Sequence, residues 1–174
     1  MIRLGEVVGY GRGLGFGLVL ALVLGLGGCE DSAAPDDQPI RLSATMKLAA
    51  DSLTVTLRVQ NVSDTTQVLE WGLCPGDHPA DFAIYRDGAM TDLVWKTPGV
   101  VVCGSPLSEM ELAPDESGTI RGVPVFVPSI LGGTDRGRFY VAAHPHGLTV
   151  RPKGASYDMP VAAKVPVGAV DLGT

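Results

Sequence analysis

The chain has 174 residues and carries 13 lysines and arginines against 19 aspartates and glutamates, which gives a net charge of −6. So acidic a protein is expected to be a poor nucleic-acid binder, because it offers no basic patch that would displace the counterions of phosphate. We also expect an anionic lipid surface to repel the protein surface.

Residues 1–28 have the three parts of an export signal: the positive residues Arg3 and Arg12, an apolar core, and small residues before the cleavage point. The apolar core, residues 14–26, is about 13 residues long, whereas a membrane-spanning helix needs roughly 20. We therefore expect residues 1–28 to be removed. The remainder, residues 29–174, then has a net charge of −7, because two arginines and one glutamate are lost. It is long enough for one domain with a core.

The residues Leu26-Gly27-Gly28-Cys29 resemble the lipobox of bacterial lipoproteins, in which a pair of small residues after leucine precedes the cysteine. The resemblance implies that Cys29 becomes the N-terminus and carries lipid. The protein would then be held in the cell membrane or the outer membrane, on the extracytoplasmic side. Several acyl chains make a firm anchor, because each buried CH₂ contributes about 0.8 kcal/mol. An ordinary secretory cleavage and an uncleaved anchor are the alternatives.

The segment that follows is acidic: residues 30–39 contain four acidic side chains, two prolines and no large apolar side chain. Such a segment cannot bury enough surface to offset the entropy that ordering costs. We therefore expect residues 29–39 to comprise the lipidated cysteine and a flexible tether.

From residue 40 the apolar residues recur at every second position, which predicts β-strands. Strands are expected at 40–48 and 53–60 as a hairpin, at 67–71, 81–86, 93–97, 118–126 and 137–143, and more weakly at 100–103 and 165–172. Pro124 interrupts one of these runs, and residues 127–133 have room for one helical turn.

Seven or eight short strands with frequent turn signals predict an all-β fold for residues 40–174. The expected architecture is an antiparallel immunoglobulin-like β-sandwich, with an up-and-down barrel as the alternative. Trp71, Phe82, Trp95 and Phe139 are the expected large core residues.

The order of several motifs resembles the BsuPI-type domain, an immunoglobulin-like fold named for an intracellular proteinase inhibitor of bacilli. The motifs are Asn61-Val62-Ser63-Asp64, Asp81-Phe82 with Asp87-Gly88, Val94-Trp95, Leu112-Ala113-Pro114-Asp115-Glu116, and the strand from Gly137 to Ala143. The resemblance implies proteinase inhibition. Two positions depart from the pattern: Asp115 stands where the turn usually has glycine, and Phe139 where the strand usually has tyrosine.

Two cysteines besides Cys29 are present, Cys74 and Cys103. An exported domain meets an oxidising environment, so we expect them to form a disulfide. Closing a loop of this length would stabilise the fold by roughly 3 to 4 kcal/mol. Free thiols, or a redox or metal role, are the alternatives.

A disulfide between these cysteines would tie together two loop segments, residues 72–79 and 104–110. Ordering a loop in advance lowers the entropy cost of binding, so these loops are the expected binding region. The candidate binding residues are Pro75, Asp77, His78, Ser105 and Pro106.

His144 and His146 could bind a metal together with His78 or Asp77, but a His-x-His pair without a third ligand at fixed spacing is a weak signal. We expect these histidines to lie at a solvent-exposed strand end, and we expect no metal, no cofactor and no catalytic residues. The carboxylates at 109, 111, 115, 116 and 135 are expected to be solvated residues of turns and a polar connector.

The sequence thus predicts a lipid-anchored, immunoglobulin-like module that binds or scaffolds an unidentified protein and has no enzymatic activity. The alternative is a proteinase inhibitor similar to the BsuPI domain. A hydrolase or metal enzyme is a third and weaker hypothesis, and it would require His144, His146 and an acid to converge in one pocket.

Overall fold

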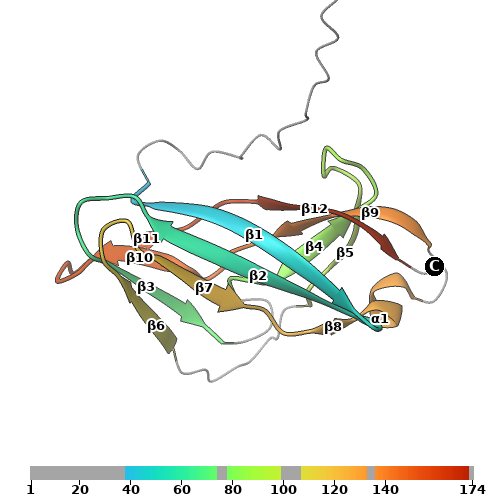
Figure 1. Ribbon diagram of the computed structural model, residues 1–174, viewed down its shortest axis with the longest axis horizontal. Helices are drawn as coiled ribbons and strands as arrows, with labels where there is room; N and C mark the ends of the chain where they lie inside the picture. The colour runs from blue at the N-terminus through green and yellow to red at the C-terminus, as the bar shows by residue number, and fades with distance from the viewer. Residues whose placement is uncertain (1–37, 74–77, 99–106, 133–135, 173–174) are drawn as a thin grey trace, which may run out of the picture.

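A computed structural model describes residues 38–73, 78–98, 107–132 and 136–172, which form an all-β domain of antiparallel sheets (Figure 1). Within these residues there are twelve strands and one short helix. The helices of the described part include none that is long and apolar enough to cross a membrane.

The first sheet, sheet A, is built on the predicted hairpin. Its strands are β1 (Ile40–Ala49), β2 (Ser52–Asn61), β7 (Ser117–Arg121) and β8 (Val125–Phe126). They follow the order β1-β2-β7, and β8 also pairs with β2. Ala49 pairs with Ser52 across a two-residue turn, and Ala50 adopts the left-handed conformation that this turn needs, with φ of 50°. Alternation turns Leu53, Val55, Leu57 and Val59 into the core, where all four are fully buried.

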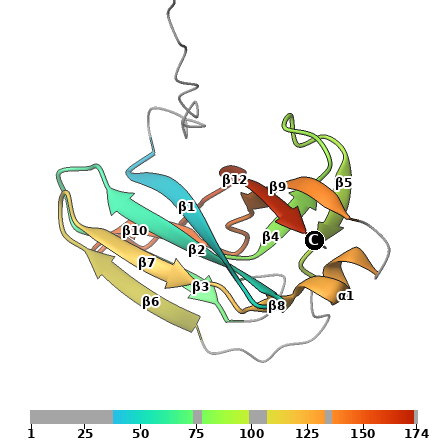
Figure 2. The same ribbon diagram turned by 45° about the vertical axis from the view of Figure 1, so that its right-hand side comes forward.

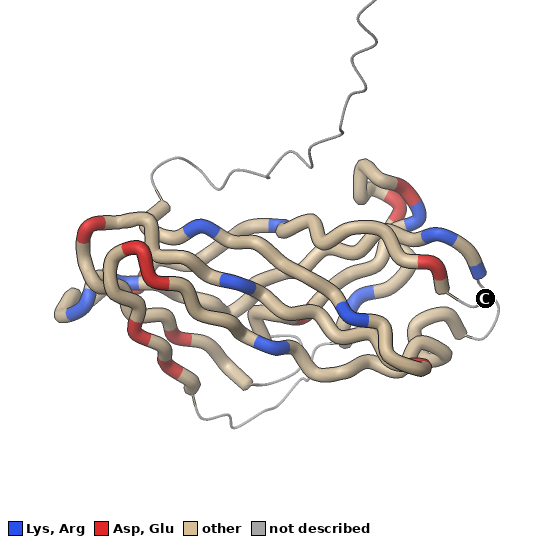
Figure 3. The backbone as a smooth tube through the Cα atoms, viewed as in Figure 1, with Lys and Arg blue, Asp and Glu red and all other residues tan. Residues whose placement is uncertain are grey.

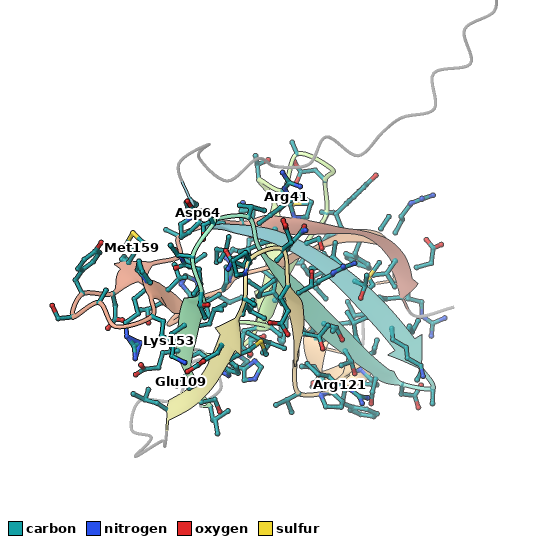
Figure 4. All side chains as sticks on the ribbon, turned by 60° about the vertical axis from the view of Figure 1, so that its left-hand side comes forward. Arg41, Asp64, Glu109, Arg121, Lys153 and Met159 are labelled. Atoms are coloured by element: carbon teal, nitrogen blue, oxygen red, sulfur yellow. The ribbon has the colours of Figure 1, made fainter. Side chains whose placement is uncertain are left out.

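The second sheet, sheet B, has the order β11-β10-β3-β6. Its strands are β3 (Gln67–Gly72), β6 (Leu107–Leu112), β10 (Thr149–Pro152) and β11 (Met159–Pro160). Ion pairs join them on the exposed side, where Arg151 lies within 3.5 Å of Glu70 and 3.6 Å of Glu109. Lys153 contacts Glu111 at 2.7 Å, and Figure 4 shows Lys153 and Glu109 at the same end of the domain.

The third sheet, sheet C, has the order β12-β9-β4-β5. Its strands are β4 (Phe82–Tyr85), β5 (Leu93–Lys96), β9 (Gly137–Ala143) and β12 (Val165–Leu172). The single helix, α1 (Val127–Leu131), buries Val127, Ile130 and Leu131 and ends at Gly132, which is left-handed with φ of 59°. Sheet B lies at one end of the domain, and sheet C and α1 lie at the other end. β1 and β2 run between these two ends (Figures 1 and 2).

One large hydrophobic cluster lies between the sheets. Trp71, Phe82 and Phe139 are buried in it, as predicted. Trp95 is only partly buried and packs on the edge of the cluster, with its ring centroid 5.4 Å from that of Phe82. The prediction that Trp95 is a core residue is therefore only partly correct.

The described residues contain more strands than the seven or eight expected, and three of them were not predicted: β6, β10 and β11. Glu109 and Glu111 lie on β6, so the prediction that they stand in a turn is wrong. Their ion pairs with Arg151 and Lys153 explain how two carboxylates are accommodated on an edge strand. The predicted strand 118–126 is split into β7 and β8, with Pro124 in the break as expected.

Candidate functional site

A cleft of about 530 Å³ opens on the face of sheet C that points away from the main core. Alternation along β4 turns Phe82 and Ile84 into the core and leaves Ala83 and Tyr85 on the opposite face. Ala83 is paired with Lys96 of β5 and with Ala142 of β9, so these side chains share that face. Ala83 lines the cleft between larger residues of β4, β5 and the segment after β9.

The residues around this cleft combine a few polar groups with apolar surface. Its lining consists of Asp81, Phe82, Ala83, Tyr85, Leu93, Lys96, Thr97, His144, His146 and Gly147. Leu93 is 51% exposed, an unusual position for a leucine next to a concave surface. A pocket of this size with scattered polar groups is typical of a binding site.

Tyr85 and His144 form the central polar contact of the cleft. The Tyr85 hydroxyl lies 3.0 Å from Nε2 of His144, and the rings stack with centroids 6.4 Å apart. The backbone N–H of His144 donates to the carbonyl oxygen of Asp81 at 2.8 Å, which continues the pairing of β9 with β4 beyond the strand ends. The imidazole of His146 stacks on His144 at 5.6 Å. His144 is therefore partly buried, whereas an exposed strand end was expected.

Positive charge gathers around His144. Burial lowers the pKa of His144 below its ordinary value of 6.5, and the charges of His146, Lys164 and Lys96 lower it further. The ammonium of Lys164 lies 4.7 Å from the centre of the Tyr85 ring and donates to the carbonyl oxygen of Met90 at 3.1 Å. A neutral imidazole with cations beside it favours a ligand that brings an anionic group.

His78 was expected to be a binding residue, and the structure gives it a different place. Its side chain is buried, and Nδ1 accepts a hydrogen bond from the backbone N–H of Ala80 at 3.2 Å. Its carbonyl oxygen accepts from the N–H of Asp81, and its own N–H donates to the Asp81 carboxylate. Burial lowers the pKa of His78, and the negative charge of Asp81 partly offsets this effect. His78 thus holds the turn before β4, and its role in binding stays a prediction.

The other predicted site residues lie outside the described residues. They are Cys29, Cys74, Pro75, Asp77, Cys103, Ser105 and Pro106. Asp81, which lines the cleft, follows the first expected binding segment by two residues. The described part of the second segment, residues 107–110, lies on β6 of sheet B and does not line the cleft. Thr97 and Phe82 are joined by backbone and side-chain hydrogen bonds of 3.0 to 3.2 Å.

The cleft brings together the residues that a hydrolase or metal enzyme would need, His144, His146 and the acid Asp81. The two imidazoles are stacked with an angle of 21° between the rings, and no group of three metal-ligating side chains suited to an ion occurs in the described parts of the chain. The Thr97 hydroxyl, which could act as a nucleophile, is instead hydrogen-bonded to the backbone of Phe82.

Sequence reasoning did not identify Tyr85, Lys96 or Leu93 as site residues. All three lie within predicted strands, and nothing local distinguishes them from other strand residues. The signal that could have found them is the pairing of β4 with β5 and β9, which requires knowledge of which strands are neighbours.

No known protein family matches the sequence, and neither does any curated protein. The fold is similar to two solved structures. One is the structural genomics target SoR45, with 14% identity and a TM-score of 0.35 over 81% of this chain and 90% of that one. The other is a Bordetella pertussis protein described as ApaA, with 15% identity and a TM-score of 0.31 over 76% of this chain and 89% of that one. Neither similarity supports a statement about function.

Proposed function

We propose that this chain is a lipoprotein anchored through Cys29, whose immunoglobulin-like domain binds a protein on the extracytoplasmic side of the membrane. The observation that carries the binding function is the cleft on sheet C, bordered by Tyr85, His144 and Leu93. Its volume of about 530 Å³ lies within the usual range for ligand sites, roughly 300 to 1,000 Å³.

The chemistry of the cleft suits a peptide segment of a partner. Leu93 offers exposed apolar surface, while Lys96, His146 and the Tyr85–His144 pair offer groups that fix the orientation of a ligand. Antiparallel strands hold these groups in place, so little entropy is lost when a ligand binds. Of the two segments expected to bind a partner, the first leads from β3 into β4, which lines the cleft, and the second leads from β5 into β6.

The anchor is supported by the sequence of residues 26–29 and by the acidic segment that separates Cys29 from β1. The immunoglobulin-like architecture is supported by three antiparallel sheets around one core. The intact mass of the protein, purified from host membranes without reduction, tests the anchor. A mass that begins at Cys29 with acyl groups and lacks two hydrogens is expected. An unlipidated mass with free thiols would contradict both the anchor and the disulfide.

The binding site is tested separately, by a photo-reactive amino acid placed at Leu93 in the full-length protein in its host. We expect it to crosslink a defined partner. The matched control is the same amino acid at Tyr157, which is 61% exposed and does not line the cleft. Equal crosslinking from both positions, or none from Leu93, would contradict a partner in the cleft.

A second proposal is proteinase inhibition, which the order of the BsuPI-like motifs favours. Two of these motifs meet in space, since the N–H of Asn61 donates to the carbonyl oxygen of Glu116 at 2.9 Å. The residues that this chain shares with the BsuPI-type pattern therefore hold the fold together. They do not themselves present an inhibitory loop. A stable complex with some protease in a broad panel is expected if the proposal is right, and failure against the whole panel would exclude it.

A further inference from the structure

The outer face of sheet A has a composition that the net charge of the protein does not suggest. On β1, β2 and β7 the side chains that point away from the core alternate with the buried ones. This outward set is Arg41, Ser43, Thr45, Lys47, Thr54, Thr56, Arg58, Gln60, Ser117, Thr119 and Arg121. It holds four cations among hydroxyl and amide groups, and the three strands contain no aspartate or glutamate.

The cations of this face are spread over its whole length. Figure 3 shows basic residues along β1, β2 and β7 and acidic residues in the turns at their ends. Figure 4 places Arg41 near the start of β1 and Arg121 at the end of β7. Within the described residues the four cations form no ion pair, and Arg58 makes one hydrogen bond, of 3.3 Å, to the Ser117 hydroxyl. Their charges therefore remain available to a partner.

An aromatic side chain completes the same face. Phe126 of β8 pairs with Ser52, which lies two residues before Thr54 and on the same side of β2. Its ring is 54% exposed, although it stands beside a hydrophobic core. Lys47 pairs with Thr54, and Arg121 pairs with Thr56, so both cations share the outward face with Phe126. Exposed aromatic rings among cations are typical of surfaces that meet the interface of a lipid bilayer.

We propose that the outer face of sheet A rests on the anionic lipid headgroups of the leaflet that holds the anchor. The proposal depends on the lipid anchor put forward above. Residues 29–39 lead directly into β1, and an extended chain of this length spans at most about 40 Å. The face is thus kept close to the leaflet, at an effective concentration on the order of millimolar, where a few weak charge contacts suffice.

The net charge of the protein predicts that anionic lipid repels it. We assign the interaction instead to the local positive charge on the outer face of sheet A. Asp51, in the turn between β1 and β2, lies beside Phe126, since its carbonyl oxygen accepts from the N–H of Val127 at 2.6 Å. At physiological salt the screening length is about 8 Å, so acidic residues farther than this from the leaflet are screened from it while the sheet A cations contact it. Removal of one such cation is expected to weaken the contact about fivefold.

Quenching by brominated lipid tests the proposal. Full-length lipidated protein with Phe126→Trp is reconstituted into vesicles of brominated phosphatidylcholine, with or without phosphatidylglycerol. When phosphatidylglycerol is present, we expect the fluorescence of the Phe126→Trp protein to be quenched more than that of the unsubstituted protein. We expect this additional quenching to be lost at high salt. The control is Tyr157→Trp, which is 61% exposed and lies between β10 and β11, outside sheet A.

A charge variant makes the test specific. In the Phe126→Trp background, Lys47→Gln, Arg58→Gln and Arg121→Gln together should abolish the quenching while the protein still floats with the vesicles. Quenching of Phe126→Trp no stronger than that of Tyr157→Trp would overturn the docking proposal and leave the anchor intact. Protein that does not float with the vesicles at all would overturn the anchor, and the docking proposal with it.

Discussion

The side-chain amide of Asn61 donates a hydrogen bond of 3.0 Å to the carbonyl oxygen of Leu112, 51 residues later in the chain. Asn61 ends β2 of sheet A and Leu112 ends β6 of sheet B, so this bond joins two sheets. The same amide donates to the carbonyl oxygen of Thr65, and the Asn61 oxygen accepts from the N–H and the hydroxyl of Ser63. The side chain thus closes the turn after β2 and fixes it to the turn before β7.

The first prediction is that Asn61→Ala destabilises the domain by about 2 to 3 kcal/mol. Asn61 is fully buried, and its loss leaves buried backbone groups without partners. Urea unfolding followed by circular dichroism measures the change. Ser63→Ala is the control, and it should cost about 1 kcal/mol or less, because only the contacts of one hydroxyl are lost. Equal effects of the two substitutions would contradict the linking role of Asn61.

The second prediction concerns a glycine next to the core. A Cβ atom at Gly122 would lie 2.8 Å from the carbonyl oxygen of Ala80 and 3.0 Å from that of Val55. Both obstacles are backbone atoms, which cannot move aside as a flexible side chain can. We expect Gly122→Ala to destabilise the domain by about 1 to 3 kcal/mol. At Gly88 the nearest atom is 3.4 Å away in the Tyr140 ring, so Gly88→Ala should change stability by less than about 0.5 kcal/mol. Thermal unfolding of both variants compares them.

The third prediction concerns the backbone conformation of Asp115. Asp115 has φ of 62°, the left-handed conformation that glycine adopts without strain. Glycine would therefore fit this position, and aspartate is among the few other residues that tolerate it. We expect Asp115→Gly to be more stable than Asp115→Ala by about 1 kcal/mol, measured by urea unfolding. An alanine variant as stable as the glycine variant would show that the turn can change its conformation.

Local pattern accounts for the parts of the fold that were predicted correctly. The hairpin of β1 and β2 was predicted because its apolar residues alternate without interruption, and β9 and β12 were predicted within their observed bounds. β6 was missed because Glu109 and Glu111 resemble solvated turn residues. Their partners lie about 40 residues later: Arg151 is on β10, a strand that was itself not predicted, and Lys153 is in the turn that follows it. A charged edge strand of this kind is defined by its neighbours and not by its own sequence.

The candidate site was less predictable for the same reason. Tyr85 and His144 are 59 residues apart in sequence, and their contact follows from the pairing of β4 with β9. The sequence showed that His144 and His146 carry chemistry, but it could not show that residues of β4 and β5 would form a cleft beside them. The burial of His78 was not predicted, because a buried histidine that holds a turn has the same sequence signature as an exposed one.

The fourth prediction concerns the charge around His144. The charge of Lys164 helps to lower the pKa of His144, because a nearby cation disfavours the imidazolium form. Lys164→Met keeps the aliphatic stem over Tyr85 and removes the charge, so the pKa of His144 should rise. Titration of the histidine ring signals by NMR measures it. Lys153→Met removes a cation on sheet B and should leave His144 unchanged. A rise in both variants would indicate a general effect of net charge.

The last prediction is a dependence of stability on pH. The pKa values of His78 and His144 are both lowered in the folded protein, mainly by burial, from an ordinary value of 6.5. Below that value the unfolded chain binds protons that the folded protein does not, so acid favours unfolding. The stabilising contribution is therefore complete above about pH 6.5 and is lost as the pH falls through the lowered values.

Urea unfolding at a series of pH values, from about 8 down to about 5, should show this loss as a falling midpoint. The double variant His78→Asn and His144→Gln should flatten the dependence in this range, since neither new side chain titrates. Asp87 does not interfere, because hydrogen bonds from Asp92 and Thr91 lower the pKa of its carboxyl below 3.8, outside the range measured. A wild-type protein whose unfolding midpoint does not change between these pH values would show that neither imidazole is held neutral by the fold.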